Sequence, residues 1–334
     1  MSDLVTLGET MALLSAPRIG RLRDMTQLDL GIAGAESNVA IGTVRLGHSA
    51  SWIGRVGDDE LGALVLATLR KERVDVARSV VDDAAPTALM VKERRIGDLV
   101  KVRYYRDGYA GSHLCAADVD DALVASARVL HTTGITPGLS VSARDAVTHA
   151  ITVARAAGVL VAFDVNYRSA LWAPEAAAPV LREIAGRADV VFAGEEELEL
   201  LDPQSPAEAR DTTDGGRRTG SAHVADVAAA RRVCGDAPRT VVVKRGAAGA
   251  FSVGPAGVRD EPAVPAVAVD PVGAGDAFVA GYLAALLDGE DEQGRLALGC
   301  RAGAFAVSVV GDYEGLPSRD DLALYDRGAG TTLR

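Results

Sequence analysis

The sequence predicts an α/β fold in which helices cover both faces of a mostly parallel central sheet. Two observations point to this fold class. Short apolar runs alternate along the chain with longer amphipathic runs, and the short runs are apolar throughout, as in Val241-Val242-Val243. A strand without polar alternation suits a sheet that is covered on both sides. Strands that alternate with helices favour parallel neighbours joined by helical crossovers.

The expected strands and helices follow from these two patterns. The runs expected to form strands are rich in Val and Leu, and they are residues 4–7, 128–132, 159–165, 189–192 and 240–244. The runs expected to form helices repeat apolar residues at helical spacing, and they are residues 36–46, 59–72, 143–157, 174–185, 224–234, 275–287 and 293–309. The length is enough for one large or two modest domains, and we expect a single domain over residues 1–334.

Two stretches, residues 9–34 and 87–106, break the alternation of strands and helices. Within the second, the turn Ile96-Gly97-Asp98 separates two runs with strand periodicity. In the later run one face would carry Val100, Val102, Tyr104 and Arg106, and the other Lys101, Arg103 and Tyr105. Such a hairpin layer is either a lid over a site or an ordinary antiparallel edge, and the pattern leaves both open.

Composition and charge bound the partners of the chain. It has 334 residues and a formal net charge of −11, which argues against nucleic acid or an anionic membrane surface as the main partner. Its three cysteines are scattered, so neither a disulfide framework nor a zinc site is expected. The N-terminus lacks a basic start and an apolar signal core, which predicts a cytoplasmic protein. Residues 203–223, rich in Gly, Thr, Asp and Arg, predict a mobile surface loop.

The strongest chemical signal is the segment 270–278, which reads DPVGAGDAF. Its glycines allow a tight turn directly before a helix, whose first N–H groups lack carbonyl partners and attract negative charge. Asp276 lies in the first turn of that helix, where its carboxylate could accept a proton from a hydroxyl group. The alternative is that Asp276 only stabilises the helix start as a first-turn acid.

Three further glycine-rich segments accompany this motif. Residues 244–251 (KRGAAGAF) predict a strand, a turn and a second strand, where backbone can lie against a nucleotide. Residues 31–38 (GIAGAESN) predict a glycine turn that leads into a helix, and residues 53–62 read IGRVGDDELG.

These motifs, in this order, resemble the ribokinase-like (phosphofructokinase B-type) carbohydrate kinases over residues 4–317. The matching signatures are GAxxN…GxVGxDxxG, from Gly34 to Gly62, and DxxGAGDxF at 270–278. The resemblance implies a three-layer α/β/α sandwich with a small β-sheet lid over the sugar. It also implies transfer of the γ-phosphoryl group of ATP to a sugar hydroxyl with Mg²⁺. It leaves a monovalent cation open, and it suggests a homodimer or higher homo-oligomer formed through exposed lid strands.

The resemblance also implies roles for individual residues. Asp276 is then the general base, and the anion hole is formed by Gly273, Ala274 and Gly275. The sugar side contains Gly34 and Asn38, and the nucleotide side contains Asn166, Lys244, Gly246, Gly249 and Gly275. Glu197 acts on the metal indirectly, through water. Two positions depart from the family pattern, because Gly194 and Cys300 stand where Asn is usual; Cys300 is also explained as a small buried apolar residue.

Two segments indicate the sugar. Tyr104-Tyr105-Arg106 and residues 164–172 (DVNYRSALW) resemble the branch of the family that phosphorylates 2-keto-3-deoxygluconate at its terminal hydroxyl to the 6-phosphate. In that branch Tyr104, Arg106 and Arg168 would contact the acid sugar, and a guanidinium suits a carboxylate. Without the resemblance, an exposed strand face for Tyr104 and Arg106 and a surface ion pair for Arg168 are the favoured explanations.

Three other functions are alternatives to this one. A fructokinase or another ribokinase-type sugar kinase would carry a similar 164–172 segment. A non-catalytic sugar-binding sensor of the same fold is suggested by Gly194. A dinucleotide-dependent dehydrogenase is rejected, because the first predicted strand is not followed by GxGxxG.

Overall fold

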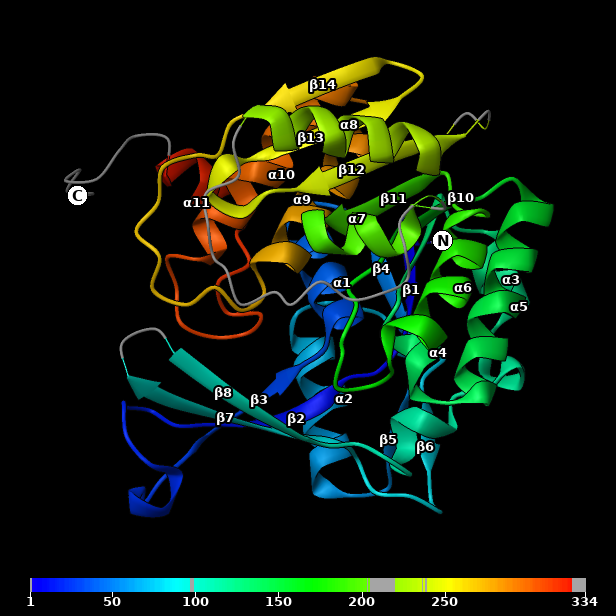
Figure 1. Ribbon diagram of the computed structural model, residues 1–334. Coiled ribbons are helices and arrows are strands. Elements are labelled where there is room, and N and C mark those ends of the chain that lie inside the picture. The colour runs from blue at the N-terminus through cyan, green and yellow to red at the C-terminus, as the bar shows by residue number, and fades with distance from the viewer. Residues whose placement is uncertain are drawn as a thin grey trace.

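An eight-stranded sheet forms the centre of the computed structural model, which describes residues 2–96, 99–202, 204, 220–235, 237 and 239–325 (Figure 1). In spatial order its strands are β14 (Gly257–Glu261), β13 (Ala250–Gly254), β12 (Thr240–Lys244), β11 (Val190–Gly194), β10 (Leu160–Asp164), β9 (Val129–Thr133), β1 (Leu4–Leu7) and β4 (Ala50–Ile53). Neighbours from β12 to β4 are parallel, and β13 and β14 are antiparallel. The mostly parallel α/β sheet predicted from the sequence is confirmed.

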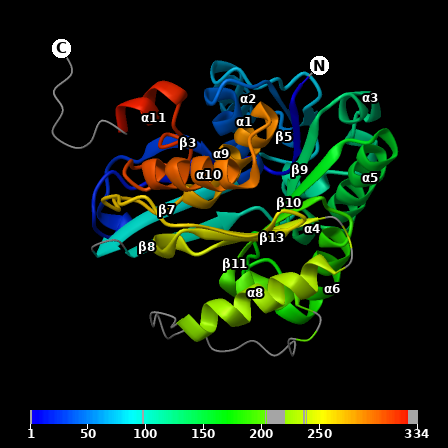
Figure 2. The ribbon, with the colours of Figure 1, turned by 90° about the horizontal axis from the view of Figure 1, so that it is seen from above.

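Helices cover both faces of this sheet (Figure 2). On one side lie α1 (Ala35–Arg45), α2 (Glu60–Lys71), α9 (Ala274–Asp288), α10 (Glu292–Ala306) and, outside them, α11 (Arg319–Tyr325). On the other lie α3 (Asp121–Ala125), α4 (Thr136–Leu139), α5 (Val141–Ala157), α6 (Pro174–Ala185), α7 (Glu195–Leu201) and α8 (Gly220–Cys234). Within β10, Val161 and Phe163 face the α5 side while Ala162 faces the α9 side. Burial on both faces is why the strands are apolar throughout.

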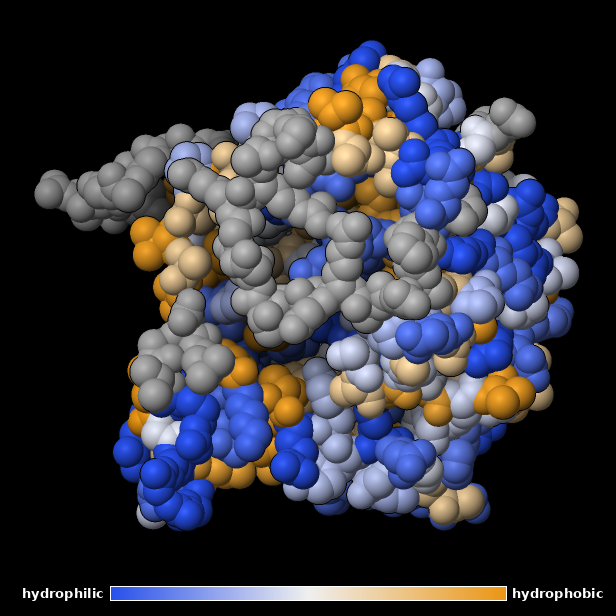
Figure 3. All heavy atoms as spheres, viewed as in Figure 1, coloured by the Kyte–Doolittle hydropathy of each residue, from blue (hydrophilic) through white to orange (hydrophobic). Residues whose placement is uncertain are grey.

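A second sheet of four strands, called here the small sheet, projects from the central fold next to α2 (Figure 1). Its order is β3 (Asp29–Ala33), β2 (Met11–Ser15), β7 (Leu89–Ile96) and β8 (Leu99–Tyr105); a separate pair consists of β5 (Arg55–Gly57) and β6 (Val80–Asp82). The outer end of the small sheet is mainly hydrophilic (Figure 3). Met90 pairs with Tyr104 and Leu89 with Tyr105, which confirms that the two tyrosines lie on opposite faces.

Close packing of α1 against α9 brings two distant parts of the chain together. A Cβ atom added to Gly42 of α1 would lie 2.6 Å from Cβ of Ala280 in α9, so a larger residue would push the helices apart. The same approach places Asn38, one turn before Gly42, beside Asp276 at the start of α9.

Some boundaries differ from the expected ones. Residues 4–7 and 240–244 form strands with the predicted limits, and β4 and α7 were not predicted. Within the predicted loop 203–223, residues 220–223 instead form the first turn of α8. His223 stabilises this turn, because its ring packs edge-on against that of Phe251 in β13, with the ring centroids 5.0 Å apart. The rest of that loop, apart from Gln204, lies outside the described residues. Within the described chain no helix has the length and apolarity to cross a bilayer.

Candidate active site

Several predicted residues meet at the carboxyl ends of the central strands, where open α/β sheets hold their ligands. Asp164 ends β10 and Lys244 ends β12, and both carboxylate oxygens of Asp164 accept hydrogen bonds of 2.9 Å from Nζ of Lys244. Nζ lies 3.7 Å from where a Cβ of Gly275 would be, so the ammonium faces the first turn of α9. Strands β10 and β12 and helix α9 therefore converge on one site.

An open cup of backbone amides lies at the start of α9. Gly273 precedes the helix with φ +79°, and a Cβ there would overlap the carbonyl oxygen of Asp312, so only glycine fits. The Ala277 amide bonds the Gly273 carbonyl at 2.8 Å, whereas the amides of Gly275 and Asp276 have no carbonyl acceptor in the described structure. Gly275 is exposed. The cup is thus free to receive an anion at the positive end of the helix dipole.

The carboxylate of Asp276 is held beside this cup by Asn38. Nδ2 of Asn38 donates to Oδ2 of Asp276 at 2.8 Å and to Oδ2 of Asp312 at 3.0 Å. Burial raises the pKa of Asp276 from 3.8 to about 7; the charges of Asp312 and Asp164 act in the same direction, while the Asn38 hydrogen bond and the charge of Arg168 oppose them. A carboxyl group with a pKa near neutrality is suited to accept a proton at physiological pH.

The two predicted arginines lie in different surroundings. Arg106 forms a buried ion pair with Glu9, and its guanidinium lies 5.2 Å from the centroid of the Tyr104 ring. Arg168 is exposed, and its guanidinium makes no hydrogen bond or ion pair with the other residues that the structure describes; only its carbonyl oxygen is bonded, accepting from the Leu171 amide at 2.9 Å. Its positive charge nevertheless reaches the site, since it lowers the pKa values of Asp276 and Asp164. Arg168 is therefore the arginine available to an anionic ligand.

Glu197 ties two loops of the site together. Its Oε1 accepts from the Tyr167 amide at 2.8 Å and its Oε2 from the Gly194 amide at 2.6 Å, so it fixes the backbone next to Asn166, which has φ +35°. Gly194 is the residue that caps α7. The described residues include no cluster of three His, Cys, Asp or Glu side chains placed to hold a metal ion. Glu197 and Asp164 nevertheless fit Mg²⁺, because this ion keeps several waters, to which their remaining lone pairs can bond.

The remaining predicted residues lie around the same sheet end or in the core. Gly34 precedes α1, and its carbonyl accepts from the Asn38 amide at 2.8 Å. Gly246 and Gly249 form the turn between β12 and β13, which the Arg245 amide closes at 2.8 Å. Cys300 is buried in the apolar core and burial raises its pKa to about 12, which confirms its interpretation as a small buried apolar residue.

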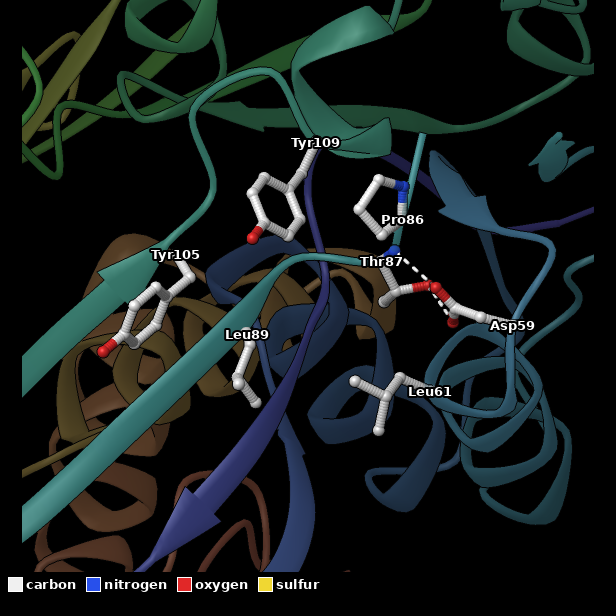
Figure 4. A pocket seen from close by; sticks show the side chains of 7 residues that line it. All are labelled: Asp59, Leu61, Pro86, Thr87, Leu89, Tyr105 and Tyr109. Carbon is white, nitrogen blue, oxygen red and sulfur yellow. Dashed lines mark hydrogen bonds between the residues drawn. The ribbon is translucent and has the colours of Figure 1, made fainter. Parts of the chain in front are cut away.

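A cavity of about 290 Å³ opens near the other face of the small sheet (Figure 4). It is lined by Asp59, Leu61, Pro86, Thr87, Leu89, Tyr105 and Tyr109, none of which is a predicted site residue. Its single charged group is Asp59, whose carboxylate accepts from the Thr87 amide, the Thr87 hydroxyl and the Gly62 amide at 2.7–2.8 Å. This carboxylate caps α2 and is therefore not free to act as an acid or base in the cavity.

Comparison with known proteins agrees with this geometry. The profile of the family described as pfkB family carbohydrate kinase matches residues 1–319. The chain belongs to the pfkB family of carbohydrate kinases. It is 37% identical over 329 residues to the 2-dehydro-3-deoxygluconokinase of Bacillus subtilis, covering 97% of this chain and 95% of that one.

Solved structures show the same architecture. The 2-dehydro-3-deoxygluconokinase of Thermotoga maritima has a TM-score of 0.85 at 26% identity, covering 97% of this chain and 98% of that one. An uncharacterised sugar kinase of Pyrococcus horikoshii in complex with ATP has a TM-score of 0.80 at 26% identity, covering 96% and 97%. The predicted ribokinase-like sandwich is confirmed.

Three polar residues of this pfkB-family chain were missed by sequence reasoning. Glu9 pairs with Arg106, Asp312 shares Asn38 with Asp276, and Glu36 accepts from the hydroxyls of Thr133 and Thr136 at 2.7 and 2.6 Å. Glu9 lies two residues after the end of the first strand, at the sheet edge where ligands bind, and this position was the available signal. No sequence spacing connects the other two with their partners.

The raised pKa of Asp276 predicts how Asp276→Asn changes stability with pH. Between about pH 4 and 7 the folded protein keeps a proton on Asp276 that the unfolded chain has lost, so the contribution of Asp276 to stability falls as the pH rises. Asn cannot ionise, and we therefore expect the melting temperature of Asp276→Asn, relative to wild type, to be higher at about pH 8 than at about pH 5. Asp145→Asn, at an exposed position in α5, is the control for losing one negative charge. A difference from wild type that is the same at both pH values would contradict the assignment.

Proposed function

We propose that this kinase transfers the γ-phosphoryl group of ATP to the terminal hydroxyl of 2-keto-3-deoxygluconate, forming the 6-phosphate, with Asp276 as general base. The observation that carries the proposal is the carboxylate of Asp276 beside an open amide cup, held there by Asn38 and close to neutral in its pKa. The names of the related enzymes from B. subtilis and T. maritima support the substrate.

The proposed chemistry needs only positioning and charge neutralisation. The sugar hydroxyl gives its proton to Asp276 as its oxygen bonds to the γ-phosphorus, and the bond to the leaving oxygen of ADP breaks. Negative charge that develops on the phosphoryl oxygens would be met by the predicted anion hole of Gly273, Ala274 and Gly275 and by Lys244. Among these amides, that of Ala274 is already engaged, since it lies 3.4 Å from the Pro271 carbonyl oxygen. The ion pair with Asp164 keeps this ammonium aimed at the start of α9.

ATP would lie along the carboxyl ends of β11 and β12. Lys244, Gly246 and Gly249 would line it, with Asn166 across the site, and the P. horikoshii kinase in complex with ATP supports a nucleotide in this fold. Mg²⁺, when bound to ATP, neutralises charge on the phosphates. Asp164 and Glu197 would hold its water ligands. A monovalent cation is not part of this proposal.

The sugar would bind between the start of α1 and the inner face of the small sheet, which would then serve as its lid. Three buried polar atoms there have no partner among the described residues: Oδ1 of Asn38, Oε1 of Glu9 and Nε of Arg106. Buried polar atoms are usually paired, so these suit the hydroxyl groups of a ligand. Gly34 and Tyr104 would complete the walls.

Arg168 is the residue that favours a sugar acid over a neutral ketose. Because Glu9 already neutralises Arg106, the exposed guanidinium of Arg168 would supply the charge for a substrate carboxylate. A fructokinase is the second candidate, but nothing in its substrate would use this charge. Homo-oligomerisation through the edge strands of the small sheet and a cytoplasmic location stay predictions.

A panel of sugars assayed for ADP release with Mg²⁺-ATP tests the proposed function. We expect 2-keto-3-deoxygluconate to give the highest kcat/KM, above fructose and ribose. Asp276→Asn should lower kcat by about 10²–10⁴-fold, the usual contribution of a general base, and change ATP binding little. Asp145→Asn is the control. Preference for fructose would favour the second candidate, and near-normal turnover of Asp276→Asn would exclude Asp276 as the base.

Arg168→Met tests the carboxylate contact. Losing a charge-assisted hydrogen bond of about 1.5–3 kcal/mol should raise KM for the sugar acid by roughly ten- to a hundredfold. The KM for fructose, which has no carboxylate, should change little. Arg70→Met, at an exposed position in α2, is the matched control. If KM rises equally for both sugars, Arg168 does not bind the carboxylate of the sugar acid.

A further inference from the structure

A buried ion pair connects the small sheet to the loop that forms the amide cup. Nζ of Lys92, in β7, donates to Oδ2 of Asp270 at 2.6 Å, and the two side chains are 4% and 3% exposed. Lysine is rarely buried to this degree unless it is paired. Asp270 is the first residue of the 270–278 motif, and the chemistry proposed above uses neither side chain.

The carboxylate of Asp270 also holds its own loop. Its Oδ1 accepts from the Val272 amide at 3.2 Å and its Oδ2 from the Gly311 amide at 3.4 Å. The Asp270 amide bonds the Val307 carbonyl at 3.1 Å. These contacts fix the turn that leads directly into Gly273, so the position of the cup depends on this carboxylate.

We propose that Lys92 is a positioning residue that supplies the cation Asp270 requires, so that the amide cup is held in place without a monovalent metal ion. This inference rests on the proposed function, because its effect on turnover assumes phosphoryl transfer at the cup. The family resemblance left a monovalent cation open. At Asp270, the buried carboxylate that holds the loop of the cup, the ammonium group of Lys92 already supplies a positive charge.

The charge of Lys92 reaches further into the site. Burial raises the pKa of Asp312, and Lys92 is among the groups that oppose this rise. Asp312 shares the Asn38 amide with Asp276, and its carbonyl oxygen packs against Gly273. One lysine from the small sheet therefore compensates two carboxylates around the cup, and it does so only while the small sheet lies against the site.

Lys92→Met tests the inference first by stability, which needs no activity. Methionine keeps an apolar stem but leaves Asp270 buried without a counter-charge, which is strongly destabilising. A small cation that binds only the folded variant would stabilise it. We expect the melting temperature of Lys92→Met to be higher in K⁺ or NH₄⁺ than in tetramethylammonium at equal ionic strength. Wild type and Lys101→Met, exposed in β8, should melt alike in all three salts.

Turnover gives the second readout. Wild-type kcat should be the same in the three salts within about twofold. Lys92→Met in tetramethylammonium should lose about 10²-fold in kcat, the cost of a misplaced reacting geometry, and K⁺ or NH₄⁺ should restore part of it. Lys101→Met should behave as wild type.

The double variant Lys92→Met/Asp270→Asn covers the case in which the single variant does not fold. Removing both charges takes away the unpaired buried carboxylate, so it should fold, melt alike in all three salts and still turn over slowly. Three results would overturn the inference: a wild-type kcat that depends on K⁺, a folded Lys92→Met whose melting temperature is the same in all three salts, or a double variant with the kcat of wild type. If wild type phosphorylates no sugar, the proposed function fails, while the melting experiment still decides the role of Lys92.

Discussion

The hydrogen bonds from Asn38 to Asp276 and Asp312 join the parts of the molecule on which the site depends. Asn38 belongs to the first helix of the central fold and Asp276 to α9, far along the chain. The side chain reaches across because Gly42 lets α1 approach α9 closely. Asn38 is thus both a wall of the sugar site, as the resemblance implied, and the group that fixes the proposed base.

The site combines several carboxylates with positively charged side chains, although the chain as a whole is acidic. The net charge is −11, and the carboxylates of Asp164, Asp276 and Asp312 gather where an anionic nucleotide and an acid sugar would bind. Three side chains from different elements supply positive charge near these carboxylates: Lys244 from β12, Lys92 from the small sheet and Arg168 from the loop after β10. Placing these cations locally allows an acidic protein to handle anions.

Much of the fold and part of the site could be predicted from the sequence. The buried strands were found because both of their faces are apolar, and the cup was found because its glycines and Asp276 are adjacent in the chain. The inner and outer faces of β8 followed from strand periodicity alone, as Tyr104 and Tyr105 show.

The missed features share a physical cause, which is that they join residues far apart in sequence. The Glu9–Arg106 and Lys92–Asp270 pairs arise only when the small sheet packs on the core, and no local pattern marks them. The early start of α8 depends on His223 contacting a strand that comes later in the chain. Tertiary contacts therefore determine these ion pairs and this helix boundary, which local sequence propensity does not specify.

The central claim is that Asp276 is a base whose pKa is raised by burial and lowered in part by the Asn38 hydrogen bond, and the pH dependence of kcat/KM for the sugar tests it most directly. The account predicts a fall of about tenfold per pH unit below about pH 7. In Asn38→Leu this acidic limb should move to higher pH, because the hydrogen bond that lowers the pKa of Asp276 is gone. A profile without an acidic limb between about pH 6 and 8, or a limb that Asn38→Leu leaves in place, would contradict the account.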